Sequence, residues 1–528
     1  MKGYLCLVLH AHLPFVRHPE HEIFMEEDWL FEAITETYVP LLWSFERLAA
    51  EGVDFRITMS MTPPLVSMLM DRLLQERYVR HMRKLIDLSR KEVIRTKFLG
   101  AINKSARRYL QLFQDILDYF LNHNCDLVGI FSGFQNRGNL EIITCGATHG
   151  FLPFMQICPQ AQKAQIQIAR EHYQCCFGRP PRGIWLPECA YIRGVENILA
   201  ENGISYFFTD AHGILYGEPR PKYGIYSPVL TPAGVAAFGR DLESSQQVWS
   251  SIVGYPGHSD YREFYRDIGY DLDFDYIRPY IHPDGIRVNT GIKYHRITGR
   301  VGLMEKEPYD WERAMEQAKI HARDFVNRRR DQALQMAAYM PWRPIVVSPY
   351  DAELFGHWWY EGPAFIEEIL RLASSDESLV RTLTPSEYLT RTPRIQPVRP
   401  INSTWGAKGY NEVWLETSND WIYRHLNEIA VRMADIARKY YNCTGIEERA
   451  LNQLARELLL AQSSDWAFIM KTNTTVQYAR KRTKIHVDRF LTLCDQLSGA
   501  AIDSDYLTAV EERDNIFPAI DFRVYARP

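Results

Sequence analysis

Two histidines at the end of the first apolar run could share one chemical site. Residues 5–9 are all apolar and are followed at once by His10 and His12, with Ala11 between them. Side chains two residues apart in a strand face the same side, so both imidazoles can point toward one ligand. Such nitrogens bind a metal ion or form hydrogen bonds with a substrate. The same pattern also fits two unrelated histidines at a strand end.

A glutamate follows another apolar run in the same way. Pro187 ends the run of residues 183–186, because proline cannot donate a hydrogen bond to a neighbouring strand. We therefore expect Glu188 where a barrel strand meets its following loop, which is where barrel enzymes carry their catalytic groups. A glutamate in this position could instead stabilise the N-terminus of a helix.

A third apolar run leads into a cluster of acids and aromatic residues. Residues 345–347 precede Asp351 and Glu353, which are surrounded in sequence by aromatic residues and His357. Burial among such neighbours disfavours the charged form of a carboxyl group and raises its pKa. An acid of this kind is suited to donate a proton.

Together these motifs point to the chemistry of the glycosidic bond. Phe, Trp and Tyr make up 13% of the chain, and the flat faces of sugar rings stack on aromatic rings. With Glu188 and Asp351 at two strand ends, one carboxylate would attack the anomeric carbon while the other protonates the leaving oxygen. His149 and Arg262 are weaker companions, which could orient hydroxyl groups or serve only in the structure.

The elements that would position these residues alternate along the chain. Short apolar runs alternate with longer helical patterns over residues 1–390, which predicts βα units around a parallel sheet or barrel. The expected strands are residues 5–9, 55–59, 140–145, 183–186, 206–209 and 344–348, and the expected helices are residues 29–50, 64–94, 105–122, 162–177, 310–338 and 363–373.

Glycine and proline recur through residues 212–258, which also contain a strand-like run at residues 235–238. So long an irregular stretch is uncommon in a compact domain unless it is functional. We expect an inserted loop or small subdomain at the active site, with Tyr223 or Tyr226 at its tip.

A proline-rich connection near residues 395–402 precedes a region with only helical patterns. This change predicts a catalytic barrel over residues 1–395 and a C-terminal helical domain over residues 396–528. The helices expected in that domain are residues 418–442, 447–463, 466–480 and 483–498.

The composition narrows the classes of partner and compartment. The 528 residues carry 61 Lys and Arg against 65 Asp and Glu, and this near balance argues against a nucleic-acid-binding protein. No apolar run is long enough to span a membrane, and the first residues lack the features of a secretory signal. The nine cysteines contain no Cys-x-x-Cys pair, which gives no indication of a zinc ribbon or a disulfide framework. These features favour a cytoplasmic protein.

Five motifs in this order resemble those of glycoside hydrolase family 57. They are His10-Ala11-His12, Ala147-Thr148-His149-Gly150, Trp185-Leu186-Pro187-Glu188-Cys189, Tyr350-Asp351-Ala352-Glu353-Leu354-Phe355-Gly356-His357-Trp358-Trp359 and Ser464-Asp465-Trp466. The first motif departs from the His-Gln-Pro of amylases and amylopullulanases and matches the branching-type subgroup. The length, the loop insertion and the helical C-terminal region are also similar to the α-1,4-glucan branching members.

The resemblance implies a fold and a mechanism. The fold would be α/β, an incomplete (β/α)7 TIM-like barrel with an inserted loop region and a C-terminal α-helical domain over the cleft. Glu188 would be the nucleophile and Asp351 the general acid/base of a retaining transfer, in which a segment of α-1,4-glucan moves to a C6 hydroxyl and forms an α-1,6 branch. No metal and no cofactor would be needed. The glucan contacts implied by the resemblance are those of His10, His12, His149, Arg262, Trp405 and Asp465.

Three other functions stay open. A 4-α-glucanotransferase or α-amylase of the same family would use the same residues without forming α-1,6 bonds. A metal-dependent sugar deacetylase or α-mannosidase on a similar barrel would use His10 and His12 as metal ligands. A non-catalytic glucan-binding protein would account for the aromatic residues but would need neither carboxylate.

Overall fold

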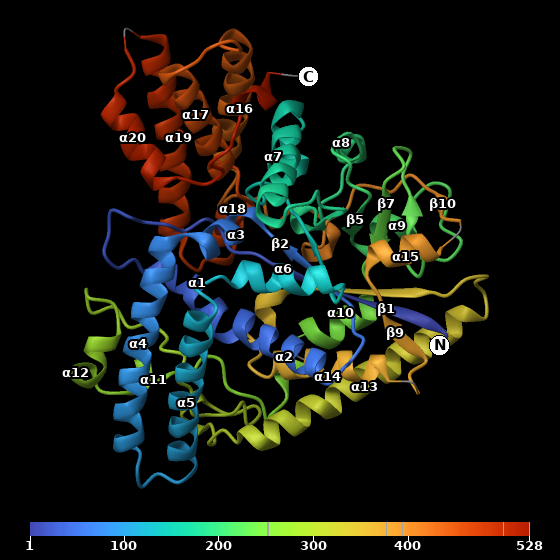
Figure 1. The fold of residues 1–528 in the computed structure, drawn as a ribbon, viewed down its shortest axis with the longest axis vertical. Helices are drawn as coiled ribbons and strands as arrows, with labels where there is room; N and C mark the ends of the chain where they lie inside the picture. Colours follow the sequence, from blue (N-terminus) through green and yellow to red (C-terminus); the bar gives the residue numbers. More distant parts are fainter. Residues whose placement is uncertain (251–252, 376, 393, 500, 527–528) are drawn as a thin grey trace.

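The strands lie among the helices in the middle of the molecule (Figure 1), in two five-stranded sheets. Seven strands of the described ranges, all parallel, follow one another around a ring. The computed structural model describes residues 1–250, 253–375, 377–392, 394–499 and 501–526. The ring consists of β1 (Gly3–Ala11), β2 (Ile57–Met61), β3 (Leu140–Ile143), β4 (Gly183–Ile184), β5 (Tyr206–Thr209), β7 (Ala236–Gly239) and β8 (Ile345–Asp351). Short additional strands are β6 (Val229–Leu230), β9 (Val380–Thr382) and β10 (Gln396–Pro397).

Two single contacts close the ring. β1 lies between β2 and β8, and β2 pairs with β3, while β4, β5 and β7 form a second parallel set. A parallel bridge between Thr144 and Ile184 joins β3 to β4. On the other side, the amide of Asp241 donates a hydrogen bond of 2.8 Å to the carbonyl of Val347. The predicted seven-stranded barrel is thereby confirmed.

The helices expected in the barrel are present with two exceptions, and two further helices, Leu127–Arg137 and Val195–Glu201, were not expected. The barrel helices include α2 (Val39–Ala50), α3 (Pro63–Met70), α4 (Arg72–Arg95), α5 (Ala101–Asn122), α6 (Leu127–Arg137), α7 (Pro159–Phe177), α8 (Val195–Glu201), α13 (Trp311–Ala337) and α14 (Gly362–Ser374). The helix expected over residues 64–94 is divided at Asp71, whose extended backbone and side chain cap the start of α4. The second exception precedes α2, where α1 (Asp28–Ala33) is followed by a π-helical turn, Ile34–Tyr38.

The segment 212–258 differs from the expected inserted loop. It contributes β7 to the ring, and α10 (Leu242–Trp249) follows that strand. The carbonyl of Tyr226 accepts a hydrogen bond from the amide of Ile345, at the start of β8 and therefore at the opposite end of that strand from Asp351. The expectation that Tyr223 or Tyr226 forms a loop tip over the active site is therefore wrong. Residues 251–252 of this segment lie outside the described part of the chain.

The longest irregular stretch comes later than expected. Between residues 253 and 310 the chain forms only short turns and the four-residue helices α11 (Ile268–Asp271) and α12 (Phe274–Ile277). It packs beside the long hairpin of α4 and α5, at the lower left of Figure 1. The glycine and proline residues around β7 led to the expectation of this irregularity at residues 212–258.

A group of helices forms the C-terminal part of the chain and stands at the top of Figure 1. It contains α16 (Trp421–Lys439), α17 (Ile446–Ala461), α18 (Ser464–Thr472), α19 (Val476–Ser498) and α20 (Ser504–Arg513). Asn473, in the left-handed conformation, ends α18 and separates it from α19 earlier than expected. Residues 396–405 run along the barrel through β10 and bridges to the segments at 218 and 191. The domain boundary at residue 395 stays a prediction.

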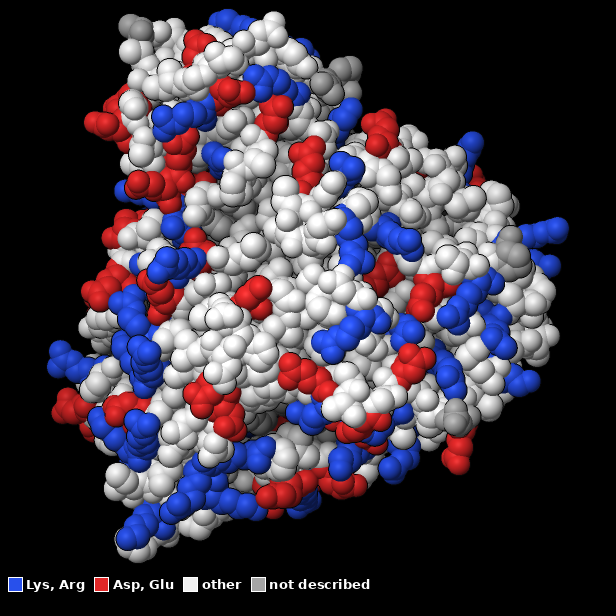
Figure 2. All heavy atoms as spheres, in the orientation of Figure 1, with Lys and Arg blue, Asp and Glu red and all other residues white. Residues whose placement is uncertain are grey.

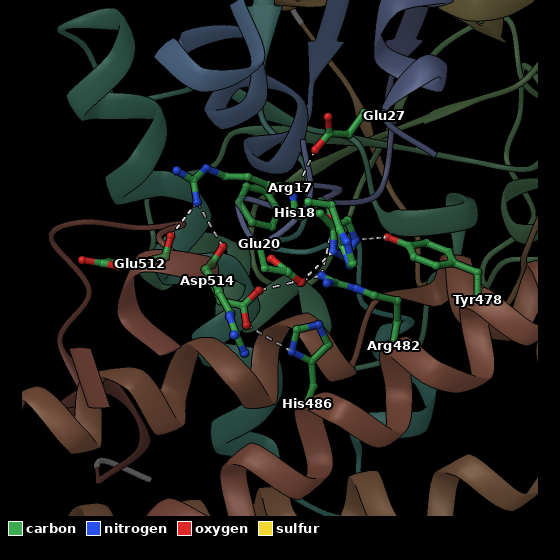
Figure 3. Close-up of polar contacts among 12 residues, drawn as sticks. Arg17, His18, Glu20, Glu27, Tyr478, Arg482, His486, Glu512 and Asp514 are labelled. Carbon is green, nitrogen blue, oxygen red and sulfur yellow. Dashed lines mark hydrogen bonds and ion pairs between the residues drawn. The ribbon is translucent and has the colours of Figure 1, made fainter. Parts of the chain in front are cut away.

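The helical part is held to the barrel by a polar junction (Figure 3). The imidazole Nε2 of His18 lies 2.9 Å from the hydroxyl of Tyr478, and Arg482 donates to the carbonyl of Phe15 at 3.2 Å. The Arg17 guanidinium donates to the carbonyl of Glu512. Because these contacts join the segment after β1 to α19 and α20, they fix the position of α18 above the barrel.

Charges of both signs are interspersed on the face drawn in Figure 2. None of the helices in the described ranges is long and apolar enough to cross a membrane.

Candidate active site

The strand ends bring the predicted residues together at one edge of the barrel. In the parallel register of β1, His10 pairs with Ser60 of β2 on one side and with Asp351 of β8 on the other. His12 follows β1, and its amide donates a hydrogen bond of 3.1 Å to Glu353 just beyond β8. The histidines and the acids of the first and fourth motifs therefore share the same carboxyl edge of the sheet.

Glu188 occupies a strained backbone position next to these strands. It lies in a short 3-10 turn, Pro187–Cys189, directly after β4, with φ at +61°. Cys189 and His149 also have positive φ values, of 49° and 57°. Non-glycine residues in this region are uncommon and are concentrated at functional sites.

Two donors from the C-terminal part of the chain hold the Glu188 carboxylate. Trp405 Nε1 donates to Oε2 at 2.9 Å, and the Ser464 hydroxyl lies 3.0 Å from Oε1. His149 Nδ1 is 3.8 Å from the same oxygen. The side chain is 12% exposed, so the carboxylate reaches the solvent-accessible side while most of it is enclosed.

These surroundings act on the pKa of Glu188 in opposite directions. Burial raises its pKa above the usual range, and the neighbouring carboxylate of Asp465 adds to that effect. The hydrogen bonds from Trp405 and Ser464 lower the pKa, because they are made to the charged form. The two donors thus favour the ionised state that a nucleophile requires.

Asp351 is suited to the complementary role. Burial, followed by the charges of Glu353 and Glu188, raises the pKa of Asp351 to about 8. In the described part of the chain, no side chain donates a hydrogen bond to the Asp351 carboxyl group. Glu353, by contrast, is held by the Tyr38 hydroxyl at 2.5 Å and by the amide of His12. A carboxyl group with a pKa in this range holds its proton at neutral pH, as a general acid requires.

His12 and Asp465 form an ion pair beside Glu188. His12 Nε2 lies 3.0 Å from the Asp465 carboxylate, and its Nδ1 lies 3.1 Å from the Thr62 hydroxyl. Burial would lower the pKa of His12, but the charge of Asp465 and the hydrogen bond to it raise the value overall. Burial would likewise raise the pKa of Asp465, but His12 lowers it to about 2.

His10 and His149 form a second, neutral pair. Their Nε2 atoms lie 3.0 Å apart, and burial lowers the pKa of both well below the usual value. His10 also stacks on the ring of Trp185, with 4.8 Å between the centroids. The structure thus brings all three predicted histidines into one stacked and hydrogen-bonded cluster.

Some of these atoms are close enough together to be considered as metal ligands. His12, His149 and Asp465 form one such group, and His10, Cys145 and His149 form another, each with ligand atoms within 4.8 Å. The rings of His12 and His149 are nearly parallel, at 14°, with centroids 3.9 Å apart. Nitrogen lone pairs of stacked rings do not converge on one point, as a tetrahedral zinc site requires. The arrangement therefore favours hydrogen bonding over metal ligation.

Arg262 lies away from this cluster. Its guanidinium donates to Glu36 at 2.8 Å and to the Tyr109 hydroxyl at 3.3 Å, and it stacks on the ring of Tyr360. The side chain is only 2% exposed. A guanidinium so enclosed cannot contact a glucan in this conformation, so the expectation for Arg262 is not supported. Its partner Glu36 is turned inward by the π-helical turn.

Three polar residues of the site were missed or left without a role. Ser60 and Thr62 face His10 and His12 across the β1–β2 pair, and Ser464 contacts Glu188. The Ser-x-Thr spacing after β2 repeats the His-x-His spacing after β1, and this parallel could have identified the first two. No sequence pattern identifies Ser464, apart from its position next to Asp465.

Trp405 contacts the Glu188 carboxylate by its ring nitrogen. We expect Trp405→Phe to reduce kcat/KM by about 10-fold, because a hydrogen bond to a charged group contributes about 1.5–3 kcal/mol and part of the lost bond is replaced by water. The acid limb of the pH profile, which is the fall of kcat/KM at low pH, should also shift to higher pH. The control is Trp249→Phe, whose ring lies 6.3 Å from that of Trp405 and is half exposed. Equal losses in both variants would contradict a specific role for Trp405 Nε1.

Known proteins resemble this chain over its whole length. The family model of glycosyl hydrolase family 57 matches residues 6–325, and a model of the C-terminal region of 1,4-alpha-glucan branching enzymes matches residues 425–525. A 1,4-alpha-glucan branching enzyme from Thermococcus kodakarensis is 34% identical over 98% of this chain and 78% of its own.

Solved structures agree with this relationship. An alpha-amylase from Thermotoga maritima is 49% identical, with a TM-score of 0.94 over 100% of both chains. A GH57-type branching enzyme from Pyrococcus horikoshii is 34% identical, with a TM-score of 0.90 over 100% of this chain and 97% of its own. With its family motifs gathered at the carboxyl edge of a seven-stranded barrel, this chain belongs to glycosyl hydrolase family 57.

Proposed function

We propose that this protein is a retaining transglycosylase that cleaves α-1,4-glucan and joins the released segment to a C6 hydroxyl, which forms an α-1,6 branch. The observation that carries the proposal is the match of residues 425–525 to the C-terminal region of branching enzymes. That region supplies Ser464 and Asp465 to the site, where they contact Glu188 and His12.

In the first step, Glu188 and Asp351 act on the same glycosidic bond. The Glu188 carboxylate attacks the anomeric carbon while protonated Asp351 transfers its proton to the leaving oxygen. The carbon–oxygen bond breaks, the segment with the reducing end departs as an alcohol, and a glycosyl ester forms on Glu188. The pKa of about 8 for Asp351 supports this role, because the group then carries its proton at neutral pH.

In the second step, Asp351 acts as a base. Its carboxylate accepts the proton of the C6 hydroxyl of a glucan acceptor, whose oxygen attacks the anomeric carbon of the ester. Glu188 leaves as a carboxylate, and Asp351 regains its proton for the next cycle. Two inversions at the same carbon give net retention.

Hydrolysis is the second candidate function. It is favoured by the 49% identity to an alpha-amylase from Thermotoga maritima. Both reactions pass through the same glycosyl ester on Glu188, and they differ only in whether water or a C6 hydroxyl attacks it. Transfer therefore depends on how well the acceptor excludes water from the ester.

Proton NMR of amylose incubated with the protein, combined with a reducing-end assay, separates the two functions. We expect new α-1,6 anomeric signals with few new reducing ends. Reducing ends without α-1,6 signals would replace the proposal with an α-amylase. The Glu188→Gln protein serves as the control, since it should produce neither change.

Two further proposals concern the partner and the cellular setting. We propose α-1,4-glucan as the polymer bound at the barrel edge and the cytoplasm as the compartment, where the nine free cysteines would stay reduced. We also propose that activity requires both the barrel, residues 1–395, and the helical part, residues 396–528, since Trp405 and Ser464 both hold Glu188.

A further inference from the structure

We propose that Ser464 is a positioning residue that controls the protonation of Glu188. It does so as one member of a buried chain of hydrogen bonds, which continues through His149 and His10 to Ser60. This inference rests on the proposed function, because it concerns the nucleophile of that reaction.

The chain consists of four consecutive short contacts. Ser464 Oγ lies 3.0 Å from Glu188 Oε1, and His149 Nδ1 lies 2.8 Å from Ser464 Oγ. His149 Nε2 lies 3.0 Å from His10 Nε2, and His10 Nδ1 lies 3.2 Å from Ser60 Oγ. The four residues beyond Glu188 are each at most 3% exposed, so water cannot readily replace a missing member.

An ionised Glu188 fixes the direction of every bond in this chain. A carboxylate only accepts, so the Ser464 hydroxyl must donate to it, and the Ser464 oxygen then accepts from His149 Nδ1–H. A neutral His149 therefore has a bare Nε2, which accepts from Nε2–H of His10. The bare Nδ1 of His10 in turn accepts from the Ser60 hydroxyl. Burial keeps both imidazoles neutral, as this arrangement requires.

A protonated Glu188 allows the same chain to run in the opposite direction. The Glu188 hydroxyl would donate to Ser464, whose hydroxyl would donate to His149, and both histidines would exchange the nitrogen that carries hydrogen. The chain would end with the Ser60 hydroxyl donating to the carbonyl of Thr144 at 3.5 Å. The reversed chain holds one more proton than the first: each hydrogen has crossed its hydrogen bond to the neighbouring heavy atom, and the added hydrogen is the one on Ser60.

The two directions are not equivalent. Both directions contain the 3.2 Å contact between Ser60 and His10. Only with Glu188 ionised does the Ser464 hydroxyl donate to a charged acceptor, and such bonds are about twice as strong as those between neutral groups. Each further donor in the chain polarises the next one toward that charge. The chain therefore stabilises the ionised form of Glu188, even though Ser464, His149 and His10 lie between Ser60 and the carboxylate.

Among the described residues, the other charged groups around Glu188 form no hydrogen bond with this chain, although the ring of His12 stacks on that of His149. Asp465 and Asp351 are the acids that act on it, and His12 is the neighbouring cation. Trp405 Nε1 donates to the other carboxylate oxygen. A test must therefore alter the chain at a member that contacts none of these groups.

Ser60→Ala meets that condition, because Ser60 is fully buried and cannot contact a glucan. The readout is the pH dependence of the rate at which a fluorinated α-glucosyl fluoride labels Glu188, measured by mass spectrometry. We expect Ser464→Ala to move the acid limb upward by about 0.5–1 pH unit, since it removes one hydrogen bond to the carboxylate. Ser60→Ala should move the acid limb of the pH–rate profile upward as well, by a smaller amount. Ser464→Thr keeps the hydroxyl and should leave the acid limb where it is in the wild type.

Thr58→Val is the matched control. Thr58 lies two residues before Ser60 on β2, so its side chain points to the same face of the sheet. Thr58 is also fully buried, but it is not a member of the hydrogen-bond chain. The proposal is overturned if the Ser60→Ala profile coincides with that of Thr58→Val, or if Ser464→Ala lowers the rate equally at every pH. Labelling does not depend on the acceptor, so a shifted limb without α-1,6 products would refute the branching function and leave the chain intact.

Histidine tautomers provide a test that needs no activity. In ¹⁵N NMR spectra of the wild-type protein above the acid limb, His149 should carry hydrogen on Nδ1 and His10 on Nε2. The opposite tautomers, or a protonated imidazolium at either position, would overturn the proposal even if the Ser60→Ala protein failed to fold.

Discussion

Replacing Glu188 with glutamine should lower kcat/KM for α-1,4-glucan by about 10,000-fold or more, because an amide cannot form the glycosyl ester. The fold should be unaffected. The amide oxygen can still accept from Trp405, and the amide nitrogen can donate to Ser464, which then donates to His149. This is the reversed direction of the hydrogen-bond chain, so glutamine is accommodated as protonated glutamic acid would be.

The experiment compares initial rates on amylose with thermal unfolding of the same preparations. A second variant, Glu188→Ala, removes the carboxylate and leaves space for azide. With an activated α-glucosyl fluoride it should form a glycosyl azide of inverted, β configuration. A residual rate within 100-fold of the wild type, at an unchanged melting temperature, would assign the nucleophile elsewhere.

Replacing Asp351 with asparagine should lower kcat/KM on amylose by about 100- to 10,000-fold, the usual contribution of a general acid. The loss should be much smaller with an α-glucosyl fluoride, because fluoride leaves without a proton. Azide should then attack the ester on Glu188 and give a product of retained, α configuration. The two variants thus yield azides of opposite configuration, and equal configurations would contradict the assigned roles.

The same substitution should also change stability with pH. Asp351 has a pKa of about 8 in the folded protein, above the ordinary value of 3.8 that the unfolded chain provides. Below the lower value both states are protonated and the group has no effect. As pH rises toward 8, ionisation favours the unfolded chain, so the wild type loses stability. Asp351→Asn should therefore match the wild-type melting temperature near pH 4 and exceed it most above pH 8.

The sequence was sufficient to predict a parallel sheet or barrel and the two carboxylates because both depend on local patterns, while the seven-stranded barrel was implied by the family resemblance. Apolar runs ending in polar motifs identified the ends of β1, β4 and β8, and parallel strands necessarily gather those ends at one edge. The roles of Glu188 and Asp351 themselves remain predictions that the variants above test.

Features that depend on packing were not predictable in this way. Arg262 was named as an arginine that could orient hydroxyl groups, but it pairs with Glu36, a buried residue of the π-helical turn that precedes α2. Such a turn has no clear sequence pattern. The strand-like run at residues 235–238 is confirmed as β7, but its place in the ring was not predictable, since its parallel pairing with β5 is a non-local contact.

The ion pair between His12 and Asp465 has a consequence for how the protein is made. The two residues are 453 positions apart in the chain. At a translation rate of about 5–20 residues per second, roughly 20–90 seconds separate their synthesis. During that interval the nascent barrel lacks both the partner of His12 and the hydroxyl that holds Glu188. The growing polypeptide on the ribosome therefore has an incomplete site until α18 has been synthesised and has folded onto the barrel.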